Sequence, residues 1–206
     1  MKRIYTLLAS MAIWAFVGTA CASGGDRISQ TRKVADFTRI EVTSVGQVYF
    51  TQSPEVTFRI EGKEKYVKNT TSEVRDGVLE IGFKDNGRRR NGNKNGVDIY
   101  LTAPTLEGVE FTGVGSFNCK ETLKADDIRF DVEGVGSLDV RDLQCKTLTL
   151  RLQGVGNADV TVQADHVDAS MDGVGSVTLS GKTRTADIDK SGIGSLDTRK
   201  LEIEED

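Results

Sequence analysis

Gly113-Val114-Gly115-Ser116 is the first of a series of related units that decide the fold. The others are Gly134-Val135-Gly136-Ser137, Gly154-Val155-Gly156-Asn157, Gly173-Val174-Gly175-Ser176 and Gly192-Ile193-Gly194-Ser195. Successive units start 21, 20, 19 and 19 residues apart. A near-constant period of about 20 residues is typical of a solenoid, in which each repeat buries its apolar side against the next repeat.

The segments between these units alternate between apolar and polar residues. In residues 148–152 leucines alternate with Thr149 and Arg151, and residues 167–171 follow the same pattern. This period of two is typical of strands with one buried face, and no amphipathic helix follows the glycines as a nucleotide-binding loop would require. We therefore predict an all-β, parallel β-solenoid with coils of about 20 residues and an irregular N-terminal half.

Two repeat positions after each unit are predicted to form inward-facing columns. The first column contains Phe117, Leu138, Ala158, Val177 and Leu196, and the second contains Cys119, Val140, Val160, Leu179 and Thr198. Because the last member of the second column is polar, we expect the core to close near the C-terminal end.

The two glycines of each unit are predicted to form the corner between two strands. Glycine adopts positive φ without a steric penalty and lets the backbone of a neighbouring coil approach closely. We expect the Val or Ile between them to be buried in the corner. The following Ser or Asn should align from coil to coil as a hydrogen-bonding ladder, with a structural role favoured over a binding role because both residues are common in turns.

The first half of the chain is interpreted as a degenerate version of the same plan. Residues 37–42, 56–60, 78–81 and 97–101 have the composition of strands, and residues 44–48 echo the glycine unit. No change in composition marks a second domain, so we expect a single β-solenoid domain over residues 34–206.

Residues 1–22 have the features of an export signal. Lys2 and Arg3 are followed by an apolar run over 4–17, which is shorter than the roughly 20 residues needed to span a bilayer. Gly18-Thr19-Ala20-Cys21 resembles a lipobox, in which Cys21 would be acylated, whereas cleavage after Ala22 would release a soluble chain. Both alternatives stay open, and residues 23–33 are expected to be a flexible N-terminal segment.

The composition excludes several classes of protein. The chain has 22 Gly but only 2 Pro, which fits neither collagen nor a proline-rich linker. With 27 basic and 31 acidic residues the net charge is −4, which argues against nucleic-acid binding. His166 is the single histidine, so a multi-histidine metal site is excluded. We expect no cofactor and no metal.

One polar stretch, residues 84–96, lacks periodicity and carries the basic cluster Arg88, Arg89 and Arg90. Its Gly and Asn content is typical of a solvated loop. The alternative is a contact site for an anionic glycan or lipid surface, since this is the only basic cluster on an acidic protein.

Aligned carboxylates are the candidates for catalysis. Asp139 and Asp159 share a repeat position with Asn118, Thr178 and Asp197. Parallel β-helices also host polysaccharide lyases and hydrolases, which need carboxylates or basic groups converging in a cleft. We expect solvated carboxylates here; the alternative is a bridging calcium ion, although the usual oxygen-rich loops are missing.

His166 and the two cysteines after the signal segment are also predicted to have no chemical role. The sequence neighbours of His166 that could act with it are Asp165 and Asp168, and we expect a solvated surface histidine rather than a general base. Cys119 and Cys145 fall at different repeat positions, which favours two free thiols over a disulfide. The sequence therefore predicts a protein that is not an enzyme.

The opening FTRIEVTSVGQVYFTQSPEVTFRIEG (residues 37–62), followed by tandem GVGS units, resembles the family of putative auto-transporter adhesins with a head GIN domain. The resemblance runs from Val34 to the C-terminus. It implies an exported protein of the type common in Bacteroidetes, with a right-handed parallel β-helix. The literal Gly-Ile-Asn tripeptide is absent, and residues 154–157 and 192–195 are its nearest forms.

Three functions remain as hypotheses. The leading one is a noncatalytic adhesin of the outer membrane or cell surface that presents a solenoid face to a protein or glycan. The second is a periplasmic accessory or structural lipoprotein that binds another envelope protein, and the third is a glycan-degrading enzyme. We expect membrane contact only through an N-terminal lipid, and self-association through an uncapped end or a flat face.

Overall fold

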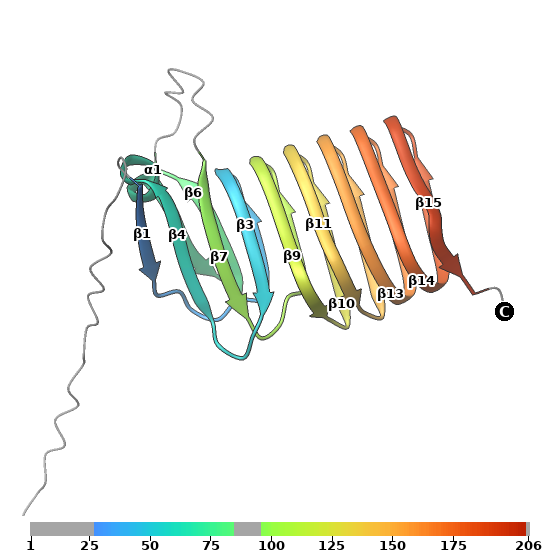
Figure 1. Cartoon of the computed structure of the whole chain (residues 1–206), viewed down its shortest axis with the longest axis horizontal. Helices are drawn as coiled ribbons and strands as arrows, with labels where there is room; N and C mark the ends of the chain where they lie inside the picture. Colours follow the sequence, from blue (N-terminus) through green and yellow to red (C-terminus); the bar gives the residue numbers. More distant parts are fainter. Residues whose placement is uncertain (1–26, 85–95, 205–206) are drawn as a thin grey trace, which may run out of the picture.

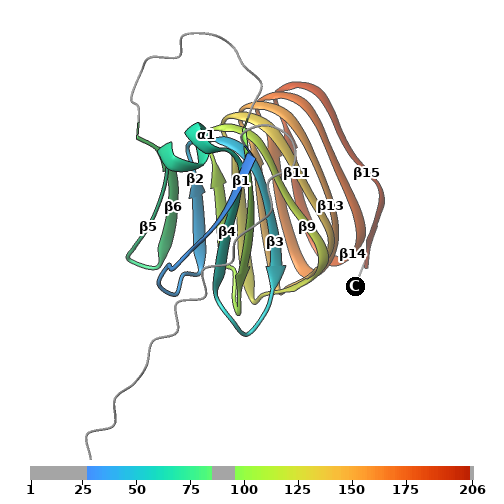
Figure 2. The same ribbon diagram turned by 60° about the vertical axis from the view of Figure 1, so that its left-hand side comes forward.

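The computed structural model describes residues 27–84 and 96–204, and these form a β-solenoid of stacked coils (Figure 1). The predicted fold class is confirmed. Each regular coil contributes one strand to a front sheet and one to a back sheet, and the glycine units join the two. Figure 2 shows the two sheets as the layers of a flattened stack.

The front sheet contains, in spatial order, β1 (Arg27–Arg32), β4 (Thr57–Lys63), β7 (Val97–Ala103), β3 (Val45–Gln52), β9 (Val114–Lys124), β11 (Val135–Gln144), the first parts of β13 (Val155–Met171) and β14 (Val174–Lys190), and β15 (Ile193–Ile203). The back sheet contains β5 (Thr70–Arg75), β6 (Val78–Phe83), β2 (Arg39–Val42), β8 (Gly108–Phe111), β10 (Asp127–Val132), β12 (Thr147–Leu152) and the second parts of β13 and β14. The long strands β13 and β14 bend from one sheet into the other, so one hydrogen-bonded network connects both layers.

The N-terminal coils are stacked in an order that differs from the chain order. β2 lies between β6 and β8, and β3 lies between β7 and β9, all in parallel register. The strands predicted in this half are present. The predicted echo of the glycine unit is also present, since Val45 pairs with Val114 and Gly46 with Gly115.

The core lies between the two sheets. Both predicted columns face inward: their members before the last coil are buried, while Leu196 and Thr198 are half-buried. Phe117 lies between the rings of Phe50 and Phe130, with ring centroids 6.2 and 6.0 Å away. Burial of such side chains stabilises the stack by about 1.5–3 kcal/mol each.

The N-terminal end of the stack corrects one expectation. Residues 23–33 were expected to be flexible, but Arg27–Arg32 form β1, which pairs antiparallel with β4. The short helix α1 (Glu64–Asn69) lies beside β1 and buries Val67. Arg32 joins these elements, because its guanidinium donates to the carbonyl oxygens of Val67 at 2.6 Å and Thr70 at 2.8 Å. The sequence did not predict this strand because its residues lack the alternation of apolar and polar side chains that marks a strand with one buried face.

The apolar residue of each glycine unit corrects a second expectation. These residues were predicted to be buried in the corner, but they are exposed: Val114 by 38%, Val135 by 52%, Val155 by 50%, Val174 by 46% and Ile193 by 74%. The cause is the alternation of the strand itself. Because Phe117 and its equivalents point inward, residues an odd number of positions away point outward.

The glycines are required by close approach between coils. A Cβ atom on Gly156 would lie 1.7 Å from the carbonyl oxygen of Gly136, and one on Gly136 would lie 2.2 Å from that of Gly115. The first glycine of each unit is restricted in the same way, since a Cβ on Gly154 would lie 2.0 Å from the carbonyl oxygen of Gly134. The same holds at the other corner glycines, which are Gly113, Gly115, Gly134, Gly173, Gly175, Gly192 and Gly194.

Several expectations fall outside the described residues. The signal segment 1–22 with Cys21 is one, and the basic cluster Arg88, Arg89 and Arg90 is another. Within the described ranges, no helix is long and apolar enough to cross a membrane.

Candidate functional site

The outward side of the front sheet, here called the front face, carries two straight rows of mostly polar side chains. Parallel and antiparallel pairing place these residues side by side on neighbouring strands, about 4.8 Å apart. The tyrosine row contains Arg59, Tyr100, Tyr49, Asn118, Asp139, Asp159, Thr178 and Asp197. The serine row contains Glu61, Asp98, Gln47, Ser116, Ser137, Asn157, Ser176 and Ser195.

The serine row is aligned as the sequence predicted, but it is not a continuous hydrogen-bonded ladder. Ser176 donates to the side-chain oxygen of Asn157 at 2.8 Å. Ser116 instead accepts a bond from Asn118 in the neighbouring row at 2.9 Å. Hydroxyl groups along this row therefore retain donors and acceptors for other partners.

A stack of three side chains begins the tyrosine row. The rings of Tyr49 and Tyr100 are 5.1 Å apart at an angle of 15°, and the guanidinium carbon of Arg59 lies 4.1 Å from the Tyr100 ring centre. Arg59 is also ion-paired with Glu61, and Tyr49 donates its hydroxyl proton to Gln47 at 2.7 Å. Burial raises the pKa of Tyr100, and the nearby carboxylates add to the effect. The stack therefore fixes Tyr49 in one orientation.

The aligned carboxylates lie further along the same row. Asp139 pairs in register with Asp159 and with Asn118, as expected from the repeat. The guanidinium of Arg141 lies 3.6 Å from Asp139. Among the residues that the structure describes, no group of three or more His, Cys, Asp or Glu is placed to hold a metal ion.

His166 lies on the outward side of the back sheet, 36% exposed in its side chain. Its partners are on the next coil rather than next to it in sequence: Nδ1 lies 2.8 Å from the hydroxyl of Thr185 and Nε2 lies 3.6 Å from Asp187. The sequence neighbours Asp165 and Asp168 are not its contacts. The arrangement is a surface cross-strand contact rather than an acid–base pair built around a nucleophile.

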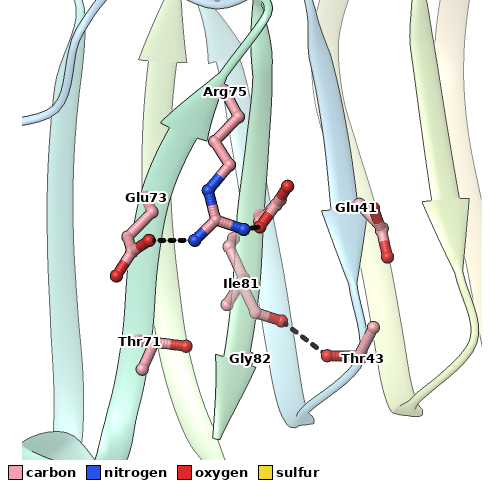
Figure 3. A pocket seen from close by; sticks show the side chains of 8 residues that line it. Glu41, Thr43, Thr71, Glu73, Arg75, Ile81 and Gly82 are labelled. Atoms are coloured by element: carbon pink, nitrogen blue, oxygen red, sulfur yellow. Dashed lines mark hydrogen bonds and ion pairs between the residues drawn. The ribbon is translucent and has the colours of Figure 1, made fainter.

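The back sheet has a shallow hollow near its N-terminal end (Figure 3). Gly82 forms its floor because it has no side chain, and Thr43 and Thr71 stand on either side. Arg75 donates to Glu73 at 2.6 Å and to Glu80 at 2.8 Å. Both carboxylates are therefore engaged in ion pairs with Arg75.

Carboxylates on neighbouring back-sheet strands form an acidic line that begins in this hollow. Glu80, Glu41, Glu110 and Asp131 pair in register. Burial raises the pKa of Glu110, and Glu41 and Glu133 add to the effect. Arg129, which pairs with Asp131, offsets part of this negative charge.

Both described cysteines are free thiols, Cys119 in the core and Cys145 half-buried. Burial raises the pKa of Cys119 to about 11 and that of Cys145 to about 12. Thiols that stay protonated near neutral pH are poor nucleophiles, so neither cysteine is suited to thiolate chemistry.

The comparison with protein families decides the assignment. The family model described as "Putative auto-transporter adhesin, head GIN domain" matches residues 36–205. The chain belongs to this family. The resemblance inferred from the GVGS units is thus confirmed, and it covers almost the whole domain. No curated protein matches the chain.

Solved structures agree on the fold. A putative adhesin from Bacteroides fragilis is 26% identical with a TM-score of 0.68, and the match covers 83% of this chain and 96% of that one. A putative adhesin from Parabacteroides distasonis is 22% identical with a TM-score of 0.78, covering 86% and 75%. A putative lipid binding protein from the same species is 21% identical with a TM-score of 0.74, also covering 86% and 75%. The last two likenesses, below 25% identity, show the fold alone.

Sequence reasoning missed the tyrosine stack. Tyr49 and Tyr100 each stand between two buried apolar residues in an alternating strand, which was a signal that both rings point outward. Their contact with each other and with Arg59 depends on the unusual stacking order of the N-terminal strands, which the sequence alone does not specify.

Proposed function

We propose that this family member is a noncatalytic, exported protein of the cell envelope that acts as an adhesin and binds through its front face. The observation that supports this most is the in-register alignment of the tyrosine and serine rows along the stack. A face that presents aligned polar side chains in successive coils suits recognition of a repeating or extended partner. Catalysis instead needs a few groups that converge on one reacting atom.

The charged groups of the described surface support a binding role over a catalytic one. Arg75 holds Glu73 and Glu80, and Arg141 lies beside Asp139. Carboxylates that are ion-paired with neighbouring arginines are less available as general acids or bases. A glycan-degrading activity would require that the purified chain release sugar products and that Asp139→Asn or Asp159→Asn abolish the release.

Attachment to the envelope is the second part of the proposal. If Cys21 is acylated, several acyl chains at one N-terminus would hold the mature chain on a membrane. Metabolic labelling with a radioactive fatty acid should then label the wild type and leave Cys21→Ser unlabelled. An unlabelled wild type would contradict acylation of Cys21.

Exposure on the cell surface is tested by protease shaving of intact cells. We expect the chain to be cleaved while a periplasmic marker in the same cells stays intact. Resistance until the outer membrane is breached would contradict the adhesin assignment. That result would support the alternative of a periplasmic accessory lipoprotein.

A further inference from the structure

We propose that Tyr49 is the wall, and Asn118 and Asp139 the floor, of a binding site for a neutral oligosaccharide on the front face. This inference rests on the proposed function and names the chemical class of its ligand. The tyrosine stack, the polarity of the floor and the repetition of the row support it in turn.

The first step is that Tyr100 stacks against one face of the Tyr49 ring, which leaves the other face directed along the row. The two ring centroids are 5.1 Å apart, and Arg59 supports Tyr100 from behind at 4.1 Å. On the open side, the next residue of the row is Asn118 on β9. Side chains in this direction are much shorter than tyrosine, since Asn118 is followed by Asp139 and Asp159. Tyr49 therefore stands above a low polar floor.

The second step is that the wall is rigid before any ligand binds. The hydroxyl of Tyr49 is held by Gln47 at 2.7 Å, and the residues on both sides of Tyr49 in β3 are buried in the core. A fixed aromatic ring adds affinity because little conformational freedom is lost on binding. Pyranose rings present flat C–H faces, and these faces pack well against the exposed face of an aromatic ring.

The third step concerns the hydrogen-bonding capacity of the floor. The amide nitrogen of Asn118 donates to the carbonyl oxygen of Val48 at 3.3 Å and to Ser116 at 2.9 Å. Its side-chain oxygen is then directed to other donors, and Asp139 adds carboxylate oxygens. Acceptors of this kind match the hydroxyl donors of a sugar. Arg141, 3.6 Å from Asp139, offsets part of the negative charge, but Asp159 extends the row with a further carboxylate. The net charge of the floor therefore disfavours a uronic acid, a sialic acid or a phosphate relative to a neutral sugar.

The fourth step is that the floor continues. Asp159 and Thr178 extend the row by one strand each, and Ser137 and Asn157 run beside them in the serine row. A polysaccharide chain lying along the stack would meet similar donors and acceptors in each coil. Longer oligosaccharides should therefore bind more tightly than a monosaccharide.

The test is isothermal titration calorimetry of residues 23–206 with neutral and acidic oligosaccharides of increasing length. The neutral set is glucose, mannose, galactose and N-acetylglucosamine oligomers. We expect at least one neutral series to bind, with affinity rising with length. Tyr49→Ala should weaken binding about tenfold or more, while Tyr49→Phe keeps the ring and stays near the wild type.

Thr149→Ala, on the outward side of the back sheet, is the matched control and should bind as the wild type does. The thermal unfolding midpoint of each variant shows whether weaker binding comes from removal of the Tyr49 ring or from unfolding of the protein. The proposal is overturned if no neutral series binds the folded wild type, if only acidic sugars bind, or if Tyr49→Ala binds unchanged. Protease shaving of intact cells tests surface exposure independently. If the oligosaccharide titration fails, the adhesin assignment is therefore still decided by the shaving result.

Discussion

At the scale of single residues, the glycine unit works through its backbone rather than through its apolar side chain. Its glycines let adjacent coils approach to a distance that excludes a Cβ atom, as at Gly156 above the carbonyl oxygen of Gly136. The Val between the glycines is exposed, as Val155 shows. The glycines of the repeat therefore set the distance between coils. The Val or Ile between them does not contribute to the core.

Gly156→Ala should destabilise the fold by about 3 kcal/mol or more, because the new Cβ would lie 1.7 Å from backbone that cannot move without shifting the coil. Gly77→Ala is the matched control. It has φ 77° and nothing within 4 Å of the new Cβ, so only the left-handed backbone costs about 1–2 kcal/mol. Urea unfolding checks both, and equal losses for the two variants would show that close approach is not the reason for the corner glycines.

The buried thiol of Cys119 and the half-buried thiol of Cys145 predict a dependence of stability on alkaline pH. Folding raises the pKa of Cys119 to about 11 and of Cys145 to about 12 from an ordinary value of 9.0. Above about pH 9 the unfolded chain therefore loses thiol protons that the folded chain keeps. The contribution is complete below that pH and is lost as the pH rises through the folded values.

Urea midpoints measured between about pH 8 and pH 11 should accordingly fall more steeply for the wild type than for the double variant Cys119→Ala, Cys145→Ala. Comparing slopes removes the effect of the small cavities, which are the same at every pH. Parallel slopes would mean that burial does not hold these thiols protonated.

At the scale of elements, the repeated coils could be predicted and the N-terminal end could not. Alternation of period two fixes which residues face inward, so the columns through Phe117 and Cys119 follow from the sequence. The position of β3 beside β9 depends on pairing between distant segments, which local patterns do not encode. For the same reason, β1 and the contact between Tyr49 and Tyr100 could not be predicted from the sequence. The alignment of Asn118 with Asp139 was therefore predictable from the repeat, and the position of Tyr49 beside them was not.

Arg32 connects the N-terminal elements through two guanidinium nitrogens that donate hydrogen bonds in different directions. We expect that no other side chain can replace both bonds. Arg32→Lys cannot reach the carbonyl oxygens of both Val67 and Thr70, so we expect a local loss of about 1.5–3 kcal/mol. Amide hydrogen exchange should rise in α1 and β5 and stay unchanged in β11 to β13.

Arg27→Lys is the matched control for that measurement. Its ion pair with Asp98, at 2.9 Å, lies on the surface, with the arginine side chain 59% exposed. Such a pair contributes about 0–1 kcal/mol. Faster exchange in α1 after Arg27→Lys, or unchanged exchange after Arg32→Lys, would contradict the role given to Arg32.

At the scale of the whole molecule, the stack has two sheets of different character. The front face carries the tyrosine and serine rows without interruption from β4 to β15. The back face carries the acidic line and the hollow held by Arg75. At the N-terminal end, β1, α1 and β5 close the stack (Figure 2). Binding by the front face is the central claim for this family member.

The most direct test of this claim is blocking each face in turn. Ser137→Arg with Thr178→Arg places two long side chains on the front face, and Thr149→Arg with Ser170→Arg places two on the back face. Flow cytometry would measure binding of the labelled mature chain to a panel of bacterial and epithelial cells. We predict that the front variant, folded by its thermal unfolding curve, loses binding while the back variant binds as the wild type does. Undiminished binding by the front variant, or equal loss by both, would contradict the claim.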